Sequence, residues 1–409
     1  MTIEHPHRQE AKATPLDCQV LETFDSPAPA RGEWDAFVQD CGSDIYLSYD
    51  WCRLWWEYYG GKRKLQIFVI RENEAMAALL PMFIDTVWLG PVRFRMAKLV
   101  GSDLPPSLCW PPVRPSRAEE IFRLVVEQLM GPGQCDAVAF APLSGVCPLT
   151  DSILNSPQGS QSFSIARNIE TEKHCLFHLP DSYEAYLESL NKKQRGNCRR
   201  ERRLIEGDFE IRLDVVGDPD TADGEFSRFI EMHNAQWHSL NKRGHFGSWP
   251  QAERFNRALV QTEARMGRLR IVRLFANGQP VSYQYVFAFG NCYYWRLPAR
   301  LMEKEWGRYS LGRVGLATLI ETAIGEGIKR IEAGIGQYEY KVQLGAEEYS
   351  TRSIVLLRNR PGARLRYRLF RYEADLLNIL YHKIWYSRLA MKLPLKKGTL
   401  WPIWIRSRT

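Results

Sequence analysis

The stretch RYSLGRVGLATLIETAIGEG, residues 308–327, carries the clearest structural signal in this sequence. An irregular turn leads into a helix that starts at Ser310, and the first N–H groups of a helix have no acceptor within it. Such groups attract phosphate; Ser310 would cap the helix, Gly312 would let a ligand approach the backbone, and Arg313 would add positive charge. The turn therefore predicts a pyrophosphate-binding site. Its residues are Ser310, Leu311, Gly312, Arg313 and Gly315.

The order of elements around this helix occurs twice in the chain. A β-hairpin is predicted at residues 64–84 and another at 268–289, where Asn277-Gly278 is a strong turn signal. A helix and then a strand follow each hairpin, at 116–130 and 135–141 in the first half and at 310–326 and 328–335 in the second. The sequence thus predicts an α/β (α+β) fold with two domains of one topology, each a mixed, mostly antiparallel sheet flanked by helices.

Length and loop composition place the domain boundaries. A chain of 409 residues exceeds what most single cores sustain, and the stretch TDSILNSPQGSQSFS indicates a loop near residue 160. A helix with a capping box from Asp181 to Glu184 is expected after this loop, ending at Gly207. The predicted divisions are a disordered leader at 1–17, an N-terminal domain at 18–160, a C-terminal domain at 161–358 and a basic amphipathic helical tail at 359–409.

The two halves differ at the position of the predicted phosphate site. The helix of the first half begins Ser116-Arg117-Ala118-Glu119-Glu120. Two glutamates in a first turn suit the helix dipole and repel a phosphate. We therefore expect the first half to be a scaffold without a donor site.

Composition excludes several classes of protein. Hydrophobic residues make up 45% of the chain and no run approaches the length of a membrane-spanning helix, which predicts a folded cytoplasmic protein. The polar leader lacks the apolar core of a secretory signal. The nine cysteines show no metal-binding spacing, and His174, Cys175 and His178 alternate along a predicted strand, so no metal is expected.

Positive charge gathers in the tail. Residues 358–409 contain thirteen Lys and Arg and two acidic residues, which gives +11, whereas the whole chain has +8, so residues 1–357 carry −3. The apolar residues of the tail at helical spacing include Leu369, Leu376, Leu380 and Ile384. This pattern is typical of a helix peripheral to the inner membrane and equally of a helix that packs its apolar stripe on the second domain. Nucleic acid is disfavoured, because the basic residues belong to no recognisable binding module.

Four segments carry a family resemblance: YEAYLESLNKKQRGNCRR at 183–200, the stretch from His233 to Trp237, SLGRVG at 310–315, and IEAGIGQYEYKVQLG at 331–345. With them, the chain resembles the GNAT-related acetyltransferases of cellulose and exopolysaccharide biosynthesis (the CelD-like family), which are similar in turn to Fem-type aminoacyltransferases. The resemblance implies tandem GNAT-like domains. It also implies a cytoplasmic acyltransferase that moves an acyl group from acyl-CoA, held by the turn at Ser310, to a sugar or lipid-linked sugar.

In two places the chain departs from the pattern of the family that it resembles. The family usually has proline before the glycine of the donor turn, where this chain has Leu311. It usually has aspartate at the position of Glu332. Glutamate keeps the carboxylate but changes its reach.

Candidate catalytic groups follow from what a GNAT-type transfer requires. The acceptor attacks the thioester directly, so the protein supplies positioning, a base for the acceptor proton and an acid for the leaving thiolate. Glu332 is the predicted base and Tyr340 the predicted acid, with Lys341 binding an anionic acceptor or the developing charge. His233, one helical turn before Trp237, is a second candidate base.

Two other functions remain open from the sequence. One is aminoacyl transfer from a charged tRNA, which the basic clusters would hold. The other is a non-catalytic effector or scaffold role in a polysaccharide assembly, with the arginine-rich tail as docking element.

Overall fold

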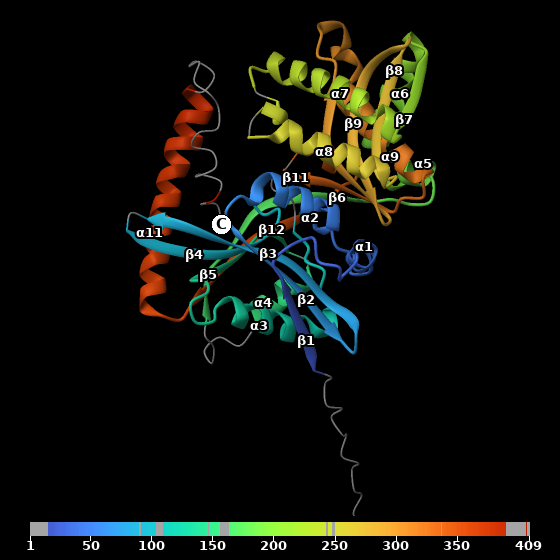
Figure 1. Ribbon diagram of the computed structural model, residues 1–409. Helices are drawn as coiled ribbons and strands as arrows, with labels where there is room; N and C mark the ends of the chain where they lie inside the picture. Colours follow the sequence, from blue (N-terminus) through green and yellow to red (C-terminus); the bar gives the residue numbers. More distant parts are fainter. Residues whose placement is uncertain are drawn as a thin grey trace, which may run out of the picture.

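Twelve strands form one continuous sheet in the computed structural model, which describes residues 15–89, 91–103, 109–145, 147–155, 163–242, 244–247, 250–336, 338–389 and 406. The order across the sheet is β1-β2-β3-β4-β5-β12-β6-β11-β10-β9-β8-β7 (Figure 1). Neighbours are antiparallel except for β4 with β5 and β10 with β11. The strands are β1 Leu16–Leu21, β2 Lys64–Glu72, β3 Ala75–Leu89, β4 Val92–Leu99, β5 Ala137–Ser144, β6 Phe163–His178, β7 Ile211–Val216, β8 Leu269–Ala276, β9 Gln279–Phe289, β10 Cys292–Arg300, β11 Arg330–Ile335 and β12 Glu347–Arg358.

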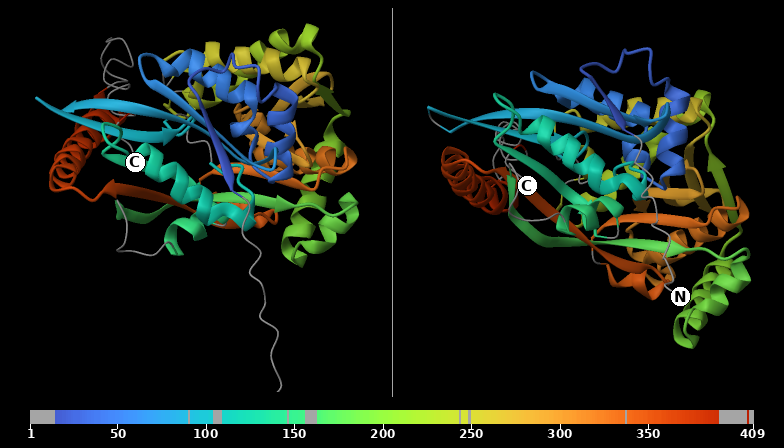
Figure 2. Two further views of the ribbon diagram at one scale, coloured as in Figure 1. Left: turned by 60° about the horizontal axis from the view of Figure 1, so that its bottom comes forward. Right: turned by 90° about the horizontal axis from the view of Figure 1, so that it is seen from below.

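Helices cover both faces of this sheet (Figures 1 and 2). The α-helices are α1 Arg31–Asp40, α2 Tyr49–Trp55, α3 Ala118–Leu129, α4 Pro148–Asn155, α5 Tyr183–Ser189, α6 Lys192–Asp208, α7 Pro219–Ser239, α8 Ala252–Arg265, α9 Leu311–Gly325, α10 Glu339–Gln343 and α11 Pro361–Leu377. The 3-10 helices are η1 Ile45–Leu47, η3 Pro115–Arg117, η4 His245–Gly247 and η5 Lys304–Tyr309, and the π-helices are η2 Trp56–Gly60 and η6 Asn378–Leu389. No helix in the described ranges is long and apolar enough to cross a membrane.

The predicted mixed, mostly antiparallel α/β architecture is confirmed, and so are both hairpins. In β8–β9, Asn277 has φ 47° and Gly278 has φ 80°, the pair of positive angles that a type I′ turn requires. In β2–β3, Asn73 and Glu74 take the same conformation, with φ of 48° and 69°. Each hairpin is followed by a third antiparallel strand and then by a parallel one, as a duplicated topology requires.

The two halves exchange strands in the middle of the sheet. The strand β6, which follows the elements of the first half, pairs with β11 of the second half, from Arg330 opposite His178 to Ile335 opposite His174. In return, β12 from the end of the second half pairs with β5 of the first, between Thr351 and Leu357. The sheet therefore runs unbroken from one half to the other. The division at residue 160 stays a prediction, and most of the predicted leader, residues 1–14, lies outside the described residues.

One predicted helix proves to be two. We expected a single helix from Asp181 to Gly207, but Leu190 is extended and separates α5 from α6. The caps explain the break: Asn191 Oδ1 accepts a hydrogen bond from Gln194 N at 2.9 Å and starts α6 anew. Ser182, and not Asp181, caps α5, with its Oγ accepting from Ala185 N at 3.1 Å.

An aromatic core joins the halves on one face of the sheet. The ring of Trp51 in α2 lies 5.7 Å from Phe287 of β9 and 6.2 Å from Phe255 of α8. Tyr46 in η1 lies 5.6 Å from Tyr294 of β10. First-half residues thus reach β9 and β10, while α9 packs on the opposite face of the same strands.

The close packing of α9 depends on Gly315. A Cβ at this position would lie 2.5 Å from both Ser282 Oγ and Gln284 Nε2, two buried side chains of β9. We predict that Gly315→Ala destabilises the protein by about 1–3 kcal/mol, as overpacking of a tight interior does.

Gly325→Ala is the matched control in the same helix, because no atom lies within 4 Å of its added Cβ. We expect this change to raise stability by about 0.5–1 kcal/mol through helix propensity. Urea unfolding of both variants measures the difference. Equal effects at the two glycines would contradict the packing role of Gly315.

Candidate active site

A cleft opens where the parallel strands β10 and β11 separate. They pair only from Cys292 opposite Arg330 to Tyr294 opposite Glu332. Beyond this point each strand has a bulge, β10 between Trp295 and Leu297 and β11 at Gly334, whose φ of 77° favours glycine. The resulting cavity has a volume of about 700 Å³ and contains residues from both halves. Its size suits a small-molecule site.

The start of α9 lies at one end of this cleft. Ser310 adopts a left-handed conformation, φ 50° and ψ 42°, and its side chain makes no capping hydrogen bond, contrary to our expectation. Its carbonyl accepts from Arg313 N at 2.8 Å and from Val314 N at 3.1 Å. The N–H groups of Leu311 and Gly312 find no acceptor among the residues that the structure describes. Gly312 lines the cleft, so its N–H is available to a ligand, whereas Leu311 is buried.

A cation that the sequence reading did not identify stands beside these amides. A Cβ on Gly312 would lie 3.4 Å from Arg300 Nε, and both residues line the cleft. Within the described ranges Arg300 makes no ion pair. Arg300 sits near the end of β10, twelve positions before Gly312, so only the tertiary structure brings them together. The pair forms an anion-binding corner.

The other predicted donor residues have different surroundings. Arg313 lines the cleft, but its Nε lies 3.0 Å from Glu201 Oε1 and its Nη1 donates to Gln343 at 2.8 Å. Its charge is thus already compensated. Leu311 packs among Ile205 and its neighbours, and Gly315 lies against β9, so neither lines the cleft.

Tyr340 and Lys341 lie in α10 and both line the cleft. Burial raises the pKa of Tyr340 to about 12, and Tyr338 adds to the effect, so this hydroxyl keeps its proton at neutral pH. The Lys341 Nζ donates to Ala333 O at 2.6 Å and lies 4.9 Å from the ring centre of Tyr338. Burial lowers the pKa of Lys341.

Glu332 points away from the cleft. Successive residues of a strand face opposite sides, so Ala333 lines the cavity while Glu332 faces the other surface of the sheet. Its carboxylate accepts from Gly334 N at 3.1 Å and lies 3.6 Å from His174 Nδ1. The side chain is buried, at 3% exposure. Glu332 is therefore separated from Tyr340 and Lys341 by the strand itself.

His233 is linked to the cleft through a second histidine. Its Nδ1 lies 3.0 Å from Pro298 O, which can only accept, so this nitrogen carries the proton. Its Nε2 then accepts from His245 Nδ1, also at 3.0 Å. This fixes Nε2 as the basic nitrogen of His245, whose ring lines the cleft. Gly244 allows the close approach of this loop to α7, because a Cβ at this position would meet Asn234 Oδ1 at 2.2 Å.

The corresponding position in the first half is closed. Cys109 N donates to Pro142 O of β5 at 3.0 Å, and Arg114 N donates to Ala77 O of β3 at 2.8 Å. This segment covers the end of β5, beside the glutamate-bearing start of α3. That the first half lacks a donor site stays a prediction.

The buried histidine pair makes stability depend on pH. Burial lowers the pKa of both His233 and His245 to about 4, whereas an unfolded histidine has a pKa near 6.5. The unfolded chain therefore binds more protons between pH 6.5 and 4. We predict that this contribution to stability is complete above about pH 6.5 and is lost as the pH falls toward 4.

Urea unfolding at pH 7 and pH 5 tests this prediction. Between pH 7 and pH 5, the free energy of unfolding should fall less for His245→Gln than for the unchanged protein. The difference between the two decreases should exceed about 1 kcal/mol. His238→Gln, which alters an exposed histidine of α7, is the control and should behave like the unchanged protein. Identical pH dependence in all three proteins would contradict the assignment.

Comparison with known proteins locates the match in this half of the chain. Residues 192–342 match the family described as acetyltransferase (GNAT) domain. Among solved structures, the chain is similar to FemX, with 9% identity, a TM-score of 0.58, and coverage of 85% of this chain and 99% of FemX. It is also similar to a conserved protein of unknown function from Bacteroides thetaiotaomicron VPI-5482, with 14% identity, a TM-score of 0.50, and coverage of 80% and 98%. No curated protein matches the sequence. Residues 192–342 therefore form a GNAT-type domain within the mixed α/β fold.

Proposed function

We propose, from the GNAT domain at residues 192–342, that this protein transfers an acyl group from acyl-CoA to an amine or hydroxyl of a sugar or lipid-linked sugar. The observation that supports the proposal is a single cavity whose two ends differ in chemical character. An anion-binding corner lies at the start of α9, and a polar, aromatic wall contributed by both halves lies at the other end. Donor and acceptor would meet between them.

The donor end suits a pyrophosphate. The amide of Gly312 and the guanidinium of Arg300 would hold its oxygens, and Gly312 leaves space for them. Arg313, bound to Glu201, would position the helix start and add little charge. The thioester would then extend along the separated edges of β10 and β11 toward Tyr340.

The acceptor end suits an oxygen-rich ring. Trp237 lines the cavity, and its buried Nε1 has no acceptor in the part of the chain that is described. Such a donor can give a hydrogen bond to an oxygen of a bound ligand. Arg296 also lines the cavity, and its Cζ lies over the ring of Tyr46, 5.3 Å from the ring centre. A sugar would offer hydroxyls to Trp237 and Arg296 and an apolar face to Tyr46.

The reaction follows from these positions. The acceptor oxygen or nitrogen attacks the thioester carbonyl while His245 Nε2 takes its proton. The C–S bond then breaks, and the protonated Tyr340 gives its proton to the thiolate. The proton on His245 then returns to Tyr340 through solvent, so both residues regain their starting protonation states. Lys341 would stabilise the negative charge that develops on the carbonyl oxygen.

Donor binding is the first test. Gly312→Glu places a carboxylate at the open helix start, so we predict that acetyl-CoA or a longer acyl-CoA binds at least about tenfold more weakly, a loss of about 1.4 kcal/mol. Isothermal titration calorimetry measures the change. Gly224→Glu adds the same charge on α7, where no atom lies within 4 Å of a Cβ, and should bind as the unchanged protein does.

The same titration separates the alternative functions. Salt-dependent binding of charged tRNA without any binding of acyl-CoA would favour the Fem-type aminoacyl transfer. If no acyl-CoA binds to the unchanged protein and no tRNA binds, the acyltransferase proposal fails and a scaffold role gains support.

A further inference from the structure

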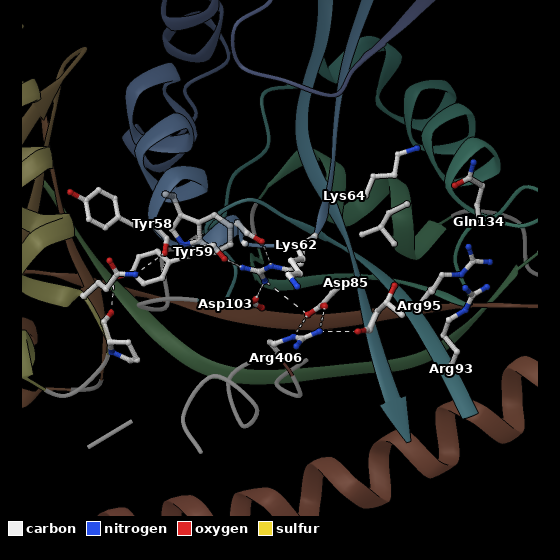
Figure 3. A pocket seen from close by; sticks show the side chains of 18 of the residues that line it. Tyr58, Tyr59, Lys62, Lys64, Asp85, Arg93, Arg95, Asp103, Gln134 and Arg406 are labelled. Carbon is white, nitrogen blue, oxygen red and sulfur yellow. Dashed lines mark hydrogen bonds and ion pairs between the residues drawn. The ribbon is translucent and has the colours of Figure 1, made fainter. Parts of the chain in front are cut away.

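A second cavity, of about 750 Å³, lies in the first half between η2, β3 and β4 (Figure 3). It shares no lining residue with the cleft beside α9. Lys64, Arg93, Arg95 and Gln134 stand at one end of it, and Tyr58 and Tyr59 at the other. Neither the GNAT fold nor the proposed transfer gives this cavity a role.

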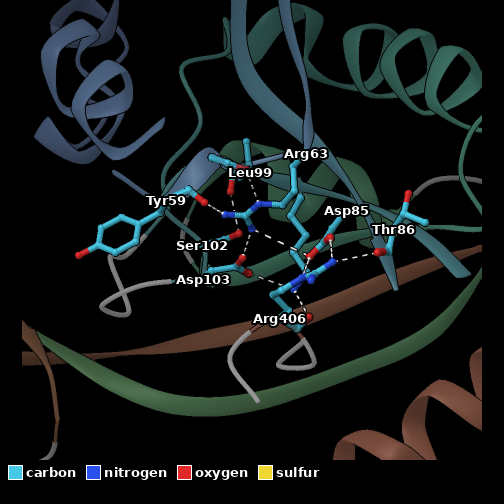
Figure 4. A network of polar contacts seen from close by, with 10 residues as sticks. Tyr59, Arg63, Asp85, Thr86, Leu99, Ser102, Asp103 and Arg406 are labelled. Atoms are coloured by element: carbon cyan, nitrogen blue, oxygen red, sulfur yellow. Dashed lines mark hydrogen bonds and ion pairs between the residues drawn. The ribbon is translucent and has the colours of Figure 1, made fainter. Parts of the chain in front are cut away.

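The acidic groups of the cavity are already neutralised. Asp85 and Asp103 are both buried, at 0% and 5% exposure. Arg406 forms an ion pair with Asp85, and Asp103 is bound by Arg63 and by Lys98 Nζ at 3.0 Å (Figure 4). Burial alone would raise the pKa of Asp103, but these two cations hold it below its usual range. The two carboxylates are not available to any further cation.

Three cations at the cavity remain without compensation. Lys62, Arg93 and Arg95 line it and make no ion pair with any described residue. Arg93 and Arg95 lie two positions apart on β4, so their side chains leave the same face of the strand. Asp136 accepts from the backbone of Arg95, but Arg366 of α11 occupies its carboxylate at 3.1 Å. A local excess of three positive charges results.

We infer that this cavity binds a phosphate-bearing ligand, with Arg93 and Arg95 holding the phosphate and the organic part extending toward Tyr58. Two neighbouring guanidinium groups match phosphate oxygens, and Lys62 adds charge for a dianion. The volume suits a small molecule or a lipid headgroup. Both sources present the same chemistry, a phosphate ester.

Calorimetry with three probes tests the inference and distinguishes the sources. The probes are inorganic pyrophosphate, glucose 1-phosphate and dihexanoyl phosphatidic acid. All measurements use the Gly312→Glu background, so that the corner at α9 does not contribute. We expect the Arg93→Gln, Arg95→Gln variant to bind the phosphate probes at least tenfold more weakly, with a shallower dependence on salt.

Arg200→Gln, Arg203→Gln is the matched control, because these exposed arginines of α6 also lack ion pairs among the described residues. Preference for glucose 1-phosphate would indicate a soluble ligand, and preference for phosphatidic acid a lipid headgroup. Equal binding by the site variant and the control, or no binding of any probe, would overturn the inference. Neither of these outcomes would count against the acyl-CoA proposal, because that proposal rests on the cleft beside α9.

An independent observation concerns α11, which has two opposite apolar faces. Ala363, Tyr367 and Phe370 are buried and pack on strand residues such as Phe94, and Ala374 on the same side of the helix is also buried. At 100° per residue, the second face is centred roughly 160° away. Its members are Leu365, Leu369, Tyr372 and Leu376, which are 61%, 42%, 73% and 43% exposed. Of the two alternatives left open for this stripe, packing on the second domain does not hold for Leu369 and Leu376, which are exposed. The helix itself lies at the edge of the molecule (Figure 2).

We propose that this outer face lies on an anionic phospholipid membrane. Arg364 and Arg368 flank the stripe and are exposed without ion pairs in the described ranges. Arginines beside an apolar stripe suit acidic headgroups above an acyl layer. In a pairing of two copies through this face, the same arginines would confront each other, which disfavours a dimer.

Flotation with vesicles of phosphatidylglycerol and phosphatidylcholine tests this second proposal. We predict that Leu365→Gln, Leu369→Gln, Leu376→Gln loses at least about tenfold in binding to anionic vesicles. Leu213→Gln, Leu240→Gln removes apolar groups of similar exposure, 42% and 46%, elsewhere and should bind normally. Equal binding by both variants, or a concentration-dependent dimer that Leu369→Gln abolishes, would overturn the proposal.

Discussion

The cleft depends on a strand pairing that ends after three residues. When β11 leaves β10, its backbone groups need new partners, because unpaired N–H and C=O groups are costly inside a protein. The strand β6 supplies them: Ile335 pairs opposite His174, and Gly336 N donates to Lys173 O at 2.9 Å. On the other side, β9 keeps β10 in place. The cleft is therefore held open by β6, a strand that precedes the helices and the hairpin of the second half.

The strand exchange also accompanies a structural difference between the two halves. In return for β6, the first half receives β12, which pairs with β5 up to Ser144. The segment from Cys109 to Arg114 then bonds to β3 and β5 and fills the space beside α3. One topology therefore yields an open cleft in the second half and a closed one in the first, without any change in the order of elements.

Local signals in the sequence predicted several of the elements but not the composition of the site. The Asn277-Gly278 turn and the start of α9 near Ser310 follow from backbone preferences of a few residues, which a sequence displays directly. The exchange of β6 and β12 depends on pairing between residues more than 150 positions apart, as for Glu170 opposite Arg352, and no local pattern encodes it. The face of Glu332 depends in turn on the register of β11. Arg300 and His245 reach the cleft through tertiary contacts alone, so sequence reasoning found Tyr340, Lys341 and Gly312 there and missed their neighbours.

Burial shifts the pKa values at the two ends of the proposed proton path in opposite directions, and both shifts favour the neutral group. It keeps the proton on Tyr340, whose pKa is raised to about 12, and keeps His233 and His245 neutral, with a pKa of about 4. A base this weak does not remove a proton from a free hydroxyl before attack. It takes the proton only as the new bond forms, when positive charge on the attacking atom makes that proton acidic. On the proposed mechanism, the position of His245 therefore matters more than its basicity. The hydrogen bonds from His245 through His233 to Pro298 O, each 3.0 Å long, hold the ring in that position.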